Sequence, residues 1–145
     1  MRIYILSRNE ELYSTRRLVE EANAKGWEVK VIDYLKCTIE IMKNELVVNY
    51  EGKVLPIPDA IVPRIGASRT FYGAAMVRHF EMIDVFSTTG NLALTRSRDK
   101  LRSLQVLSKN GVDMPKTVFA SNKSNAKDVI ALSGGAPLVL KILEG

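Results

Sequence analysis

Cationic side chains occupy the positions where this sequence could do chemistry. Lys141 lies inside an apolar run that extends from Leu138 to Leu143. An ammonium group in such a run is costly if it is buried without a partner, so it indicates either a solvated strand face or a bound anion. A second feature is a group of four cations around one expected helix start: Arg96, Arg98, Lys100 and Arg102. Helix starts and nearby lysines attract phosphate, and a solvated basic face is the alternative.

Other common kinds of site are poorly represented. The chain has one cysteine, Cys37, and one histidine, His79, which excludes zinc sites built from several such residues and any Ser-His or Cys-His pair unless His79 serves in it. We interpret Cys37 as structural and His79 as a packing or surface residue. Asp33 and Asp59 each end an apolar run without a second carboxylate at metal-ligand spacing, so we interpret both as turn or cap residues.

Neither of the two commonest phosphate-binding loops is present. The sequence has no G-x-x-x-x-G-K-[ST] loop, and Ser7, Arg8, Asn9 and Glu10 fill the turn where a G-x-G-x-x-G would follow the first strand. A simple Rossmann dehydrogenase is therefore disfavoured.

The first part of the chain predicts an α/β fold. The apolar run 3–6 indicates a buried strand, residues 12–22 have helical spacing with Gly26 as the stop, and residues 27–32 indicate a second strand. Strand, helix and strand over about thirty residues form the βαβ unit of a parallel sheet.

The next segment predicts an antiparallel hairpin followed by a further strand of the parallel sheet. Residues 38–42 and 46–50 predict a hairpin, and residues 60–62 predict a short strand that ends at Pro63. Residues 64–66, which include Arg64, then fall where a doubly wound sheet presents its ligand-facing loops. Tyr72, Met76, Phe80 and Ile83 follow at helical spacing and predict a buried stripe.

Polar, small residues at 88–91 suggest a boundary. Beyond it we expect a helix over 98–109 that ends at Asn110-Gly111, followed by strands at 116–120 and 138–143. A helix between these strands would be capped by Ser124 or Asn125 and ended by Gly134-Gly135. This arrangement is a second β-α-β stretch.

Composition fits a folded protein that attracts anions. In 145 residues, 46% are hydrophobic and 26% are charged, and the net charge is 21 − 16 = +5. A net positive charge favours binding to nucleic acid, acidic lipid, nucleotide phosphates or acidic substrates, and it does not distinguish among these four. The apolar run near the N-terminus is too short for a signal peptide or a membrane span, so we expect a cytoplasmic protein without a membrane partner.

Six ordered motifs resemble one known family. They are Ile-Leu-Ser-Arg at 5–8, Leu-Tyr-Ser-Thr-Arg-Arg-Leu at 12–18, Pro-Arg-Ile-Gly at 63–66, Thr-Phe-Tyr-Gly at 70–73, Arg-Asp-Lys-Leu-Arg-Ser at 98–103 and Gly-Gly-Ala-Pro-Leu-Val-Leu-Lys at 134–141. Together they are similar to RimK, a family of ATP-grasp ligases that add glutamate to the C-terminus of a small-subunit ribosomal protein.

The resemblance implies a fold and a set of ligands. Residues 1–95 would form a Rossmann-like pre-ATP-grasp domain, and residues 96–145 the truncated first part of the ATP-grasp fold. Lys100 and Lys141 match lysines that the family directs at ATP phosphates, and Arg64 is a candidate substrate-side residue. The family uses Mg²⁺ and an acylphosphate made from ATP, with metal ligands expected beyond Gly145. The implied partners are ATP, glutamate and the ribosomal protein, and we also expect a homo-oligomer.

The chain is then expected to be an N-terminal fragment, inactive by itself and binding ATP weakly. Two alternatives remain open. The 145 residues could be a non-catalytic module that binds nucleotide or RNA through its basic surface. The fold could also belong to an ATP-grasp ligase that acts on a different carboxylate substrate.

Overall fold

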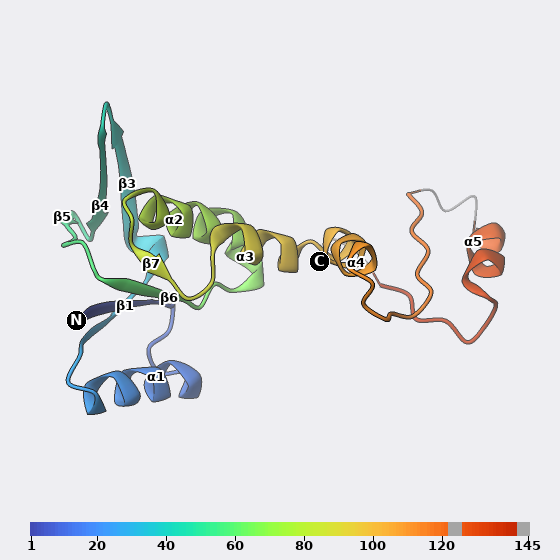
Figure 1. Ribbon diagram of the computed structural model, residues 1–145, viewed down its shortest axis with the longest axis horizontal. Coiled ribbons are helices and arrows are strands. Elements are labelled where there is room, and N and C mark those ends of the chain that lie inside the picture. Colours follow the sequence, from blue (N-terminus) through green and yellow to red (C-terminus); the bar gives the residue numbers. More distant parts are fainter. Residues whose placement is uncertain (122–125, 142–145) are drawn as a thin grey trace. The chain divides into compact units, whose positions relative to one another are not determined.

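The computed structural model describes residues 1–121 and 126–141, which fall into two compact units, Met1–Thr95 and Arg96–Gly145 (Figure 1). The elements of the first unit, in chain order, are β1 (Arg2–Leu6), α1 (Tyr13–Ala24), β2 (Glu28–Ile32), the 3₁₀ turn η1 (Tyr34–Lys36), β3 (Cys37–Met42), β4 (Glu45–Tyr50), β5 (Lys53–Val54), β6 (Ala60–Pro63), the 3₁₀ turn η2 (Ala67–Arg69), α2 (Thr70–Met82) and β7 (Phe86–Ser87). Helix α3 (Asn91–Arg98) spans the boundary, and α4 (Lys100–Lys109) and α5 (Ala126–Ser133) follow.

A four-stranded parallel sheet forms the centre of the first unit. Its order is β2-β1-β6-β7, and β1 pairs in parallel with β2 on one side and with β6 on the other. The apolar runs predicted at 3–6, 27–32 and 60–62 supply three of these strands, so the predicted parallel α/β fold is confirmed. Residues 3–6 of β1 are all buried because the strand has neighbours on both sides and helices on both faces.

The two long helices cover opposite faces of this sheet. Figure 1 shows α1 below and α2 above the strands. The predicted stripe on α2 is confirmed, since Met76 and Phe80 are buried and Tyr72 and Ile83 pack against the core from its margin. The predicted stop of the first helix is also correct, because Gly26 takes a φ of 71° just after α1 ends.

An antiparallel three-stranded sheet with the order β3-β4-β5 projects from this body (Figure 1). The predicted hairpin is confirmed, with Cys37 opposite Tyr50 and Met42 opposite Glu45. Asn44 adopts a φ of 61° in the turn, a conformation that Asn tolerates better than most residues. Val48 is buried, so the base of the hairpin closes one side of the core.

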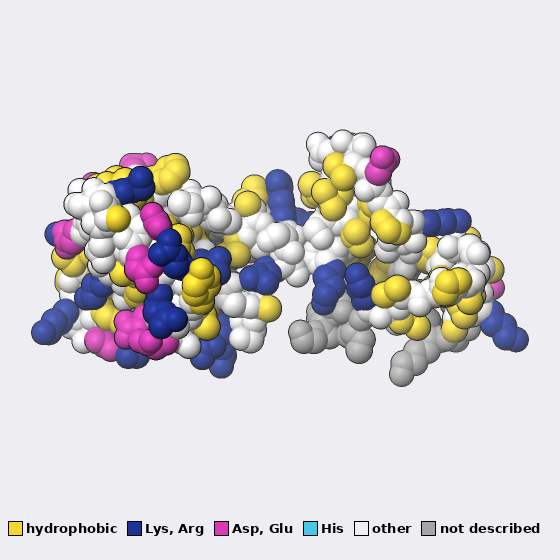
Figure 2. All heavy atoms as spheres, turned by 90° about the horizontal axis from the view of Figure 1, so that it is seen from below, with side chains coloured by type: hydrophobic (Ala, Val, Ile, Leu, Met, Phe, Trp, Pro, Cys, Tyr) yellow, Lys and Arg dark blue, Asp and Glu magenta, His cyan; other side chains and the backbone are white. Residues whose placement is uncertain are grey.

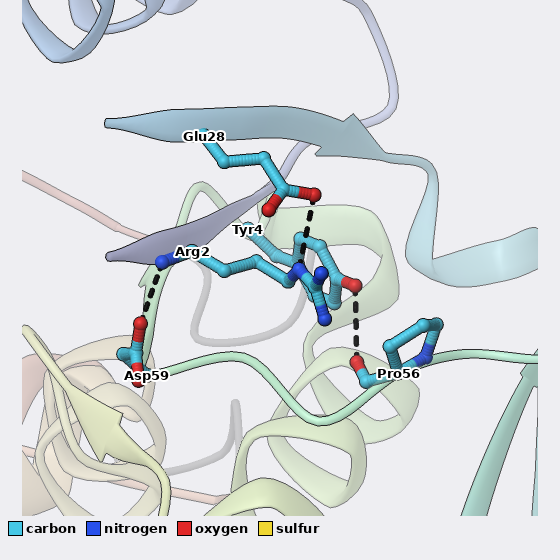
Figure 3. Close-up of polar contacts among 5 residues, drawn as sticks. All are labelled: Arg2, Tyr4, Glu28, Pro56 and Asp59. Carbon is cyan, nitrogen blue, oxygen red and sulfur yellow. Dashed lines mark hydrogen bonds and ion pairs between the residues drawn. The ribbon is translucent and has the colours of Figure 1, made fainter. Parts of the chain in front are cut away.

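Polar contacts fix the amino edge of the parallel sheet (Figure 3). The backbone N–H of Arg2 donates to Asp59 Oδ2 at 2.6 Å, and its side-chain Nε donates to Glu28 Oε1 at 3.0 Å. The hydroxyl of Tyr4 donates to the carbonyl of Pro56 at 3.0 Å. These bonds tie β1 to the start of β2 and to the segment before β6, so the amino edge serves the architecture.

A close contact between α2 and the loop after β6 sets their spacing. Gly73 lies in α2, and a Cβ at this position would overlap Cγ2 of Ile65 and approach its Cδ1 to 3.0 Å. Ile65 is itself buried, so its side chain has little room to move. The small residue in the Thr-Phe-Tyr-Gly motif is therefore required by packing.

Replacing Gly73 by alanine is expected to lower the free energy of unfolding by about 1–2 kcal/mol. Overpacking costs about 1–3 kcal/mol, and the better helix propensity of alanine returns up to about 1 kcal/mol. Urea unfolding measures the change. Gly66→Ala is the matched control, because its added Cβ meets no atom within 4 Å and Gly66 has an ordinary φ of −74°. Equal stabilities of the two variants would contradict the packing argument.

The second unit lacks a buried core in its described part. None of residues 96–121 and 126–141 is buried. Large apolar side chains are instead exposed on it, and Figure 2 shows them as yellow patches on its surface. They are Val106, Leu107, Val112, Phe119, Ile130, Leu132, Leu138, Val139 and Leu140. These side chains require a covering layer that the described residues do not supply.

Two strand predictions for the second unit are corrected. Residues 116–120 and 138–141 are not strands, and residues 142 and 143 of the second predicted strand lie outside the described residues. Apolar β-rich segments form strands only when a neighbouring strand takes up their backbone hydrogen bonds, and the described residues of this unit offer none. The helix expected at about 98–109 is confirmed as α4, and Asp99 separates it from α3, which was not predicted.

The predicted C-terminal ends of the two helices in the second unit are confirmed. Gly111 takes a φ of 68° after α4, and Gly134 and Gly135 take positive φ values after α5, as the predicted stops require. The cap expected at Ser124 or Asn125 lies outside the described residues. Within residues 1–121 and 126–141, no helix has the length and apolar character of a membrane span.

Candidate functional site

The order of the parallel sheet reverses between β1 and β6. From β1 the chain passes through α1 to β2 on one side, whereas β6 and β7 lie on the other side. In Figure 1, β1 runs into α1 and β6 runs into α2 at the same end of the sheet. Open α/β sheets bind ligands in the crevice at the carboxyl ends of strands where the order reverses. The loops after β1 and β6 are therefore the candidate ligand-facing segments of the first unit.

Arg64 lies at this reversal point, directly after β6. Its backbone N–H donates to the carbonyl of Leu6 at 2.9 Å, so the residue is fixed against the end of β1. Its Nη2 donates to Ser14 Oγ at 3.0 Å, which joins it to the first turn of α1. The side chain is exposed, and a guanidinium group has further N–H donors besides the one used by Ser14. The geometry suits Arg64 to hold a carboxylate or phosphate.

The loop after β1 is rigid, although it lacks a glycine-rich motif. Ser7 is buried, its Oγ lies 3.3 Å from the hydroxyl of buried Thr15, and the same oxygen contacts the carbonyl of Asn9 at 3.0 Å. Asn9 Oδ1 then accepts the backbone N–H of Glu11 at 2.8 Å. These bonds hold the loop in place, and the bond between Arg64 and Ser14 joins the segment after β6 to the start of α1.

The basic segment 96–102 is divided between two helices. Arg96 and Arg98 lie in the last turn of α3, where cations favour the negative end of a helix. Lys100 begins α4, whose N-cap Asp99 accepts the backbone N–H of Arg102 at 2.9 Å. Asp99 thus caps the start of α4, and Arg96, Arg98, Lys100 and Arg102 precede and follow this cap in the sequence, as expected. Lys100 can act on an anion through its ammonium group.

Lys141 is exposed, as are Leu138, Val139 and Leu140 before it. The cost of a buried unpaired ammonium group therefore does not arise among the described residues. The structure places Lys100 and Lys141 on the second unit and Arg64 on the first. It shows Arg64 in contact with Ser14.

A cavity of about 530 Å³ lies in the second unit between α4 and residues 114–119. Leu101, Leu104, Met114 and Phe119 are among its lining residues, and neither Lys100 nor Lys141 lines it. Its lining mixes these apolar side chains with polar and charged ones, Gln105, Ser108, Lys109, Lys116 and Thr117.

The residues interpreted as structural have structural roles. Cys37 is buried, and burial raises the pKa of its thiol to about 12, so it is not a thiolate nucleophile near neutral pH. Asp33 caps η1 by accepting the backbone N–H of Leu35 at 3.0 Å. Asp59 accepts the backbone N–H of Arg2. His79 is buried in α2, and its Nε2 has no hydrogen-bond partner among the described residues.

Acidification is expected to destabilise the first unit through His79. Burial lowers the pKa of His79 below 6.5, and a hydrogen bond with the Val47 backbone partly opposes this shift. The unfolded chain therefore takes up a proton first, so the stability contributed by neutral His79 is complete above its unfolded pKa and is lost as the pH falls toward the lower folded pKa. Urea unfolding across this range measures the loss. His79→Gln should flatten the profile, and an equally steep profile in that variant would contradict the assignment.

Magnesium would need carboxylate or other oxygen ligands from the described residues. Among residues 1–121 and 126–141, no group of three or more His, Cys, Asp or Glu side chains could hold a metal ion. The described residues thus supply no complete magnesium site.

Sequence models of two protein domains match almost the entire chain. The RimK PreATP-grasp domain matches residues 1–94, and the RimK-like ATP-grasp domain matches residues 97–145. The chain belongs to the RimK family. The resemblance inferred from the six motifs is therefore confirmed, as is a Rossmann-like pre-ATP-grasp fold followed by an incomplete ATP-grasp fold.

Curated relatives of this RimK chain are similar over its whole length. A probable alpha-L-glutamate ligase 1 from Pseudoalteromonas atlantica is 57% identical, and a probable alpha-L-glutamate ligase from Psychromonas ingrahamii is 53% identical. Both alignments include 100% of this chain and 48% of the relative. The chain spans about half the length of the curated relatives it matches.

Solved structures support the RimK fold at much lower identity. The macrocyclase MdnB from Microcystis aeruginosa aligns with 90% of this chain and 58% of its own, with a TM-score of 0.65 and 14% identity. The ATP-grasp ligase PsnB, complexed with a phosphomimetic variant of its minimal precursor, Mg and ADP, aligns with 94% of this chain and 56% of its own, with a TM-score of 0.64 and 14% identity. These likenesses concern the fold alone.

Sequence reasoning missed the partners that position Arg64. Ser14 and the Gly73–Ile65 contact become visible only when the loops after β1 and β6 are brought together. Both lie in motifs that carried the family resemblance, Leu-Tyr-Ser at 12–14 and Thr-Phe-Tyr-Gly at 70–73. Their position in these motifs was the only feature of the sequence that pointed to them.

Proposed function

We propose that this chain forms the first half of an ATP-dependent ligase that joins glutamate to the C-terminal carboxylate of a small-subunit ribosomal protein. The observation that supports this most strongly is the 57% identity, over every residue of the chain, with a probable alpha-L-glutamate ligase. The RimK-like ATP-grasp match at residues 97–145 supports the dependence on ATP.

The chemistry requires that a carboxylate oxygen become a leaving group. Transfer of the terminal phosphoryl group of ATP to the acceptor carboxylate produces an acylphosphate and ADP. The amine of glutamate then attacks the acyl carbon, the C–O bond to phosphate breaks, and an amide, phosphate and a proton are the products. Negative charge accumulates on phosphate oxygens in the first step, so fixed cations lower its barrier.

We assign the two lysines of the second unit to the stabilisation of this negative charge. Lys100 and Lys141 match the family lysines directed at ATP phosphates, and both ammonium groups are exposed on the described surface. The cap formed by Asp99 orients the first turn of α4 and so directs Lys100. ATP supplies the phosphoryl group when it is bound, whereas the lysines hold its phosphates in place.

We assign Arg64 to the substrate side. The exposed guanidinium group lies at the carboxyl edge of the parallel sheet and is held by Ser14. Arginine pairs with carboxylates through two parallel hydrogen bonds, so it suits a substrate that carries a carboxylate. We further propose that the active enzyme is a cytoplasmic homo-oligomer.

We infer that residues 1–145 need the remaining half of the ligase for catalysis. The described part of the second unit has no buried residue, and its exposed apolar side chains call for a covering layer. The curated relatives are about twice as long as this chain. We expect the 145 residues alone to bind ATP only in the millimolar range or more weakly, which isothermal titration calorimetry measures.

The direct test uses the complete protein with ATP, magnesium, glutamate and the purified ribosomal acceptor. Intact mass spectrometry should show the acceptor heavier by glutamyl residues, and digestion should place them at its C-terminus. Labelling of another carboxylate substrate instead would reassign the acceptor. An absence of ATP-dependent ligation with any carboxylate acceptor would contradict the proposal and favour a nucleotide- or RNA-binding module.

A further inference from the structure

Three large apolar side chains are exposed around the reversal point of the parallel sheet. Leu12 and Tyr13 lie at the start of α1, and their exposed fractions are 51% and 73%. Phe71 lies at the start of α2 and is 89% exposed. Single exposed apolar residues are common on proteins, but these three lie at the two helix starts that follow neighbouring strands. Arg64 lies in the segment between the second of these strands and its helix.

Basic residues outnumber acidic residues at the same edge. The exposed cations of the two loops and the first turn of α1 are Arg8, Arg16, Arg64 and Arg69, and the acidic residues there are Glu10 and Glu11. The edge therefore combines apolar contact area with an excess of positive charge. A peptide that ends in carboxylates and has apolar groups before them is complementary to both properties.

We propose that Leu12, Tyr13, Arg64 and Phe71, here named the carboxyl-edge patch, bind the C-terminal segment of the protein acceptor. Arg64 pairs with a carboxylate at the end of that segment, and the three apolar side chains pack against the residues that precede it. This assignment deepens the proposed function and rests on it. It makes the first unit the part that recognises the acceptor.

The size of the patch favours a peptide over the smaller substrates. Free glutamate is too small to use apolar side chains at two helix starts in addition to Arg64, and the phosphates of ATP are assigned to Lys100 and Lys141. A peptide can bury Tyr13 and Phe71 together, and exposed aromatic side chains are frequent anchors in peptide and protein recognition. The acceptor segment is therefore the occupant that uses the whole patch.

The patch is held ready before the ligand arrives. Arg64 is anchored by its bonds to Leu6 and Ser14, and Ile65 is wedged against Gly73 at the start of α2. A rigid surface loses less conformational freedom on binding, which favours recognition of a flexible chain end.

The test compares Tyr13→Ala and Phe71→Ala in the complete ligase. The acceptors are a decapeptide with the C-terminal sequence of the ribosomal acceptor and a dipeptide with the same last two residues. Each variant should raise KM for the decapeptide by about tenfold and change KM for ATP and glutamate by less than about twofold. The decapeptide's advantage over the dipeptide should shrink in both variants, because the dipeptide does not reach the apolar side chains.

Phe86→Ala is the matched control, since Phe86 is 67% exposed but lies at the start of β7, toward the opposite edge of the sheet. It should leave every constant unchanged. Unaltered KM for the decapeptide in Tyr13→Ala and Phe71→Ala would overturn the proposal while glutamate ligation continued. A lowered melting temperature with equal increases of KM for ATP and decapeptide would also overturn it, because the patch would then pack against the rest of the chain. Loss of ligation in the wild-type protein would instead overturn the proposed function.

Discussion

Replacing Lys141 by alanine in the complete ligase is expected to lower kcat/KM for ATP by about 10²- to 10³-fold. Removal of one preorganised group that stabilises transition-state charge typically has an effect of this size. Lys141 is proposed to meet the phosphates directly, and its exposed side chain supports no packing that alanine would disrupt. Steady-state kinetics with varied ATP, together with nucleotide titration, measures both the catalytic and the binding part of the loss.

Two companion variants make this result specific. Lys100→Ala should show a loss of the same kind, because Lys100 is assigned to the same phosphates. Lys127→Ala is the matched control, since Lys127 is an exposed lysine on α5 without an assigned role. A Lys141→Ala enzyme that resembled Lys127→Ala in its ATP kinetics would show that Lys141 does not contact nucleotide.

Replacing Arg64 by glutamine is expected to raise KM for the protein acceptor by about thirtyfold. The loss corresponds to ~2 kcal/mol of charge-assisted hydrogen bonding. Because Arg64 is assigned to the substrate side, KM for ATP should stay nearly constant. Arg64→Lys should give an intermediate value, since lysine keeps the charge but lacks the planar pair of donors that matches a carboxylate.

The geometry around Arg64 supplies a second readout. Ser14→Ala removes the hydroxyl that holds Nη2 at 3.0 Å and should raise KM for the acceptor by a smaller factor than Arg64→Gln. Arg78→Gln, an exposed arginine on α2, is the control and should leave KM unchanged. An Arg64→Gln enzyme with normal acceptor kinetics would remove Arg64 from the substrate side.

The helices and strands of the first unit could be predicted because the spacing of apolar residues within each short segment indicates its secondary structure. The strand at 3–6, the stripe of Met76 and Phe80, and the hairpin at 38–50 all depend on residues close in sequence. The strands expected at 116–120 and 138–141 required partner strands distant in sequence, and apolar composition alone cannot supply a partner. Helix α3 was also missed, because the polar, small residues at 88–91 were interpreted only as a boundary.

The candidate site was predictable only in part. The position of residue 64 after a parallel strand indicated a ligand-facing loop, because sheet topology follows from the order of elements. The roles proposed for Lys100 and Lys141 came from the family resemblance, since four cations in seven residues are also compatible with a solvated face. Tyr13 and Phe71 could not be singled out, because helical spacing does not show which apolar side chains at a helix start stay exposed.

The most direct test of the account follows oxygen from the acceptor to phosphate. An acceptor peptide labelled with ¹⁸O in its C-terminal carboxylate is incubated with the complete ligase, ATP, magnesium and glutamate, and the released phosphate is analysed by mass spectrometry. We expect that the first amide bond formed on each acceptor transfers one labelled oxygen to phosphate, because the carboxylate oxygen leaves as part of the acylphosphate. A first glutamylation that releases only unlabelled phosphate would contradict this mechanism.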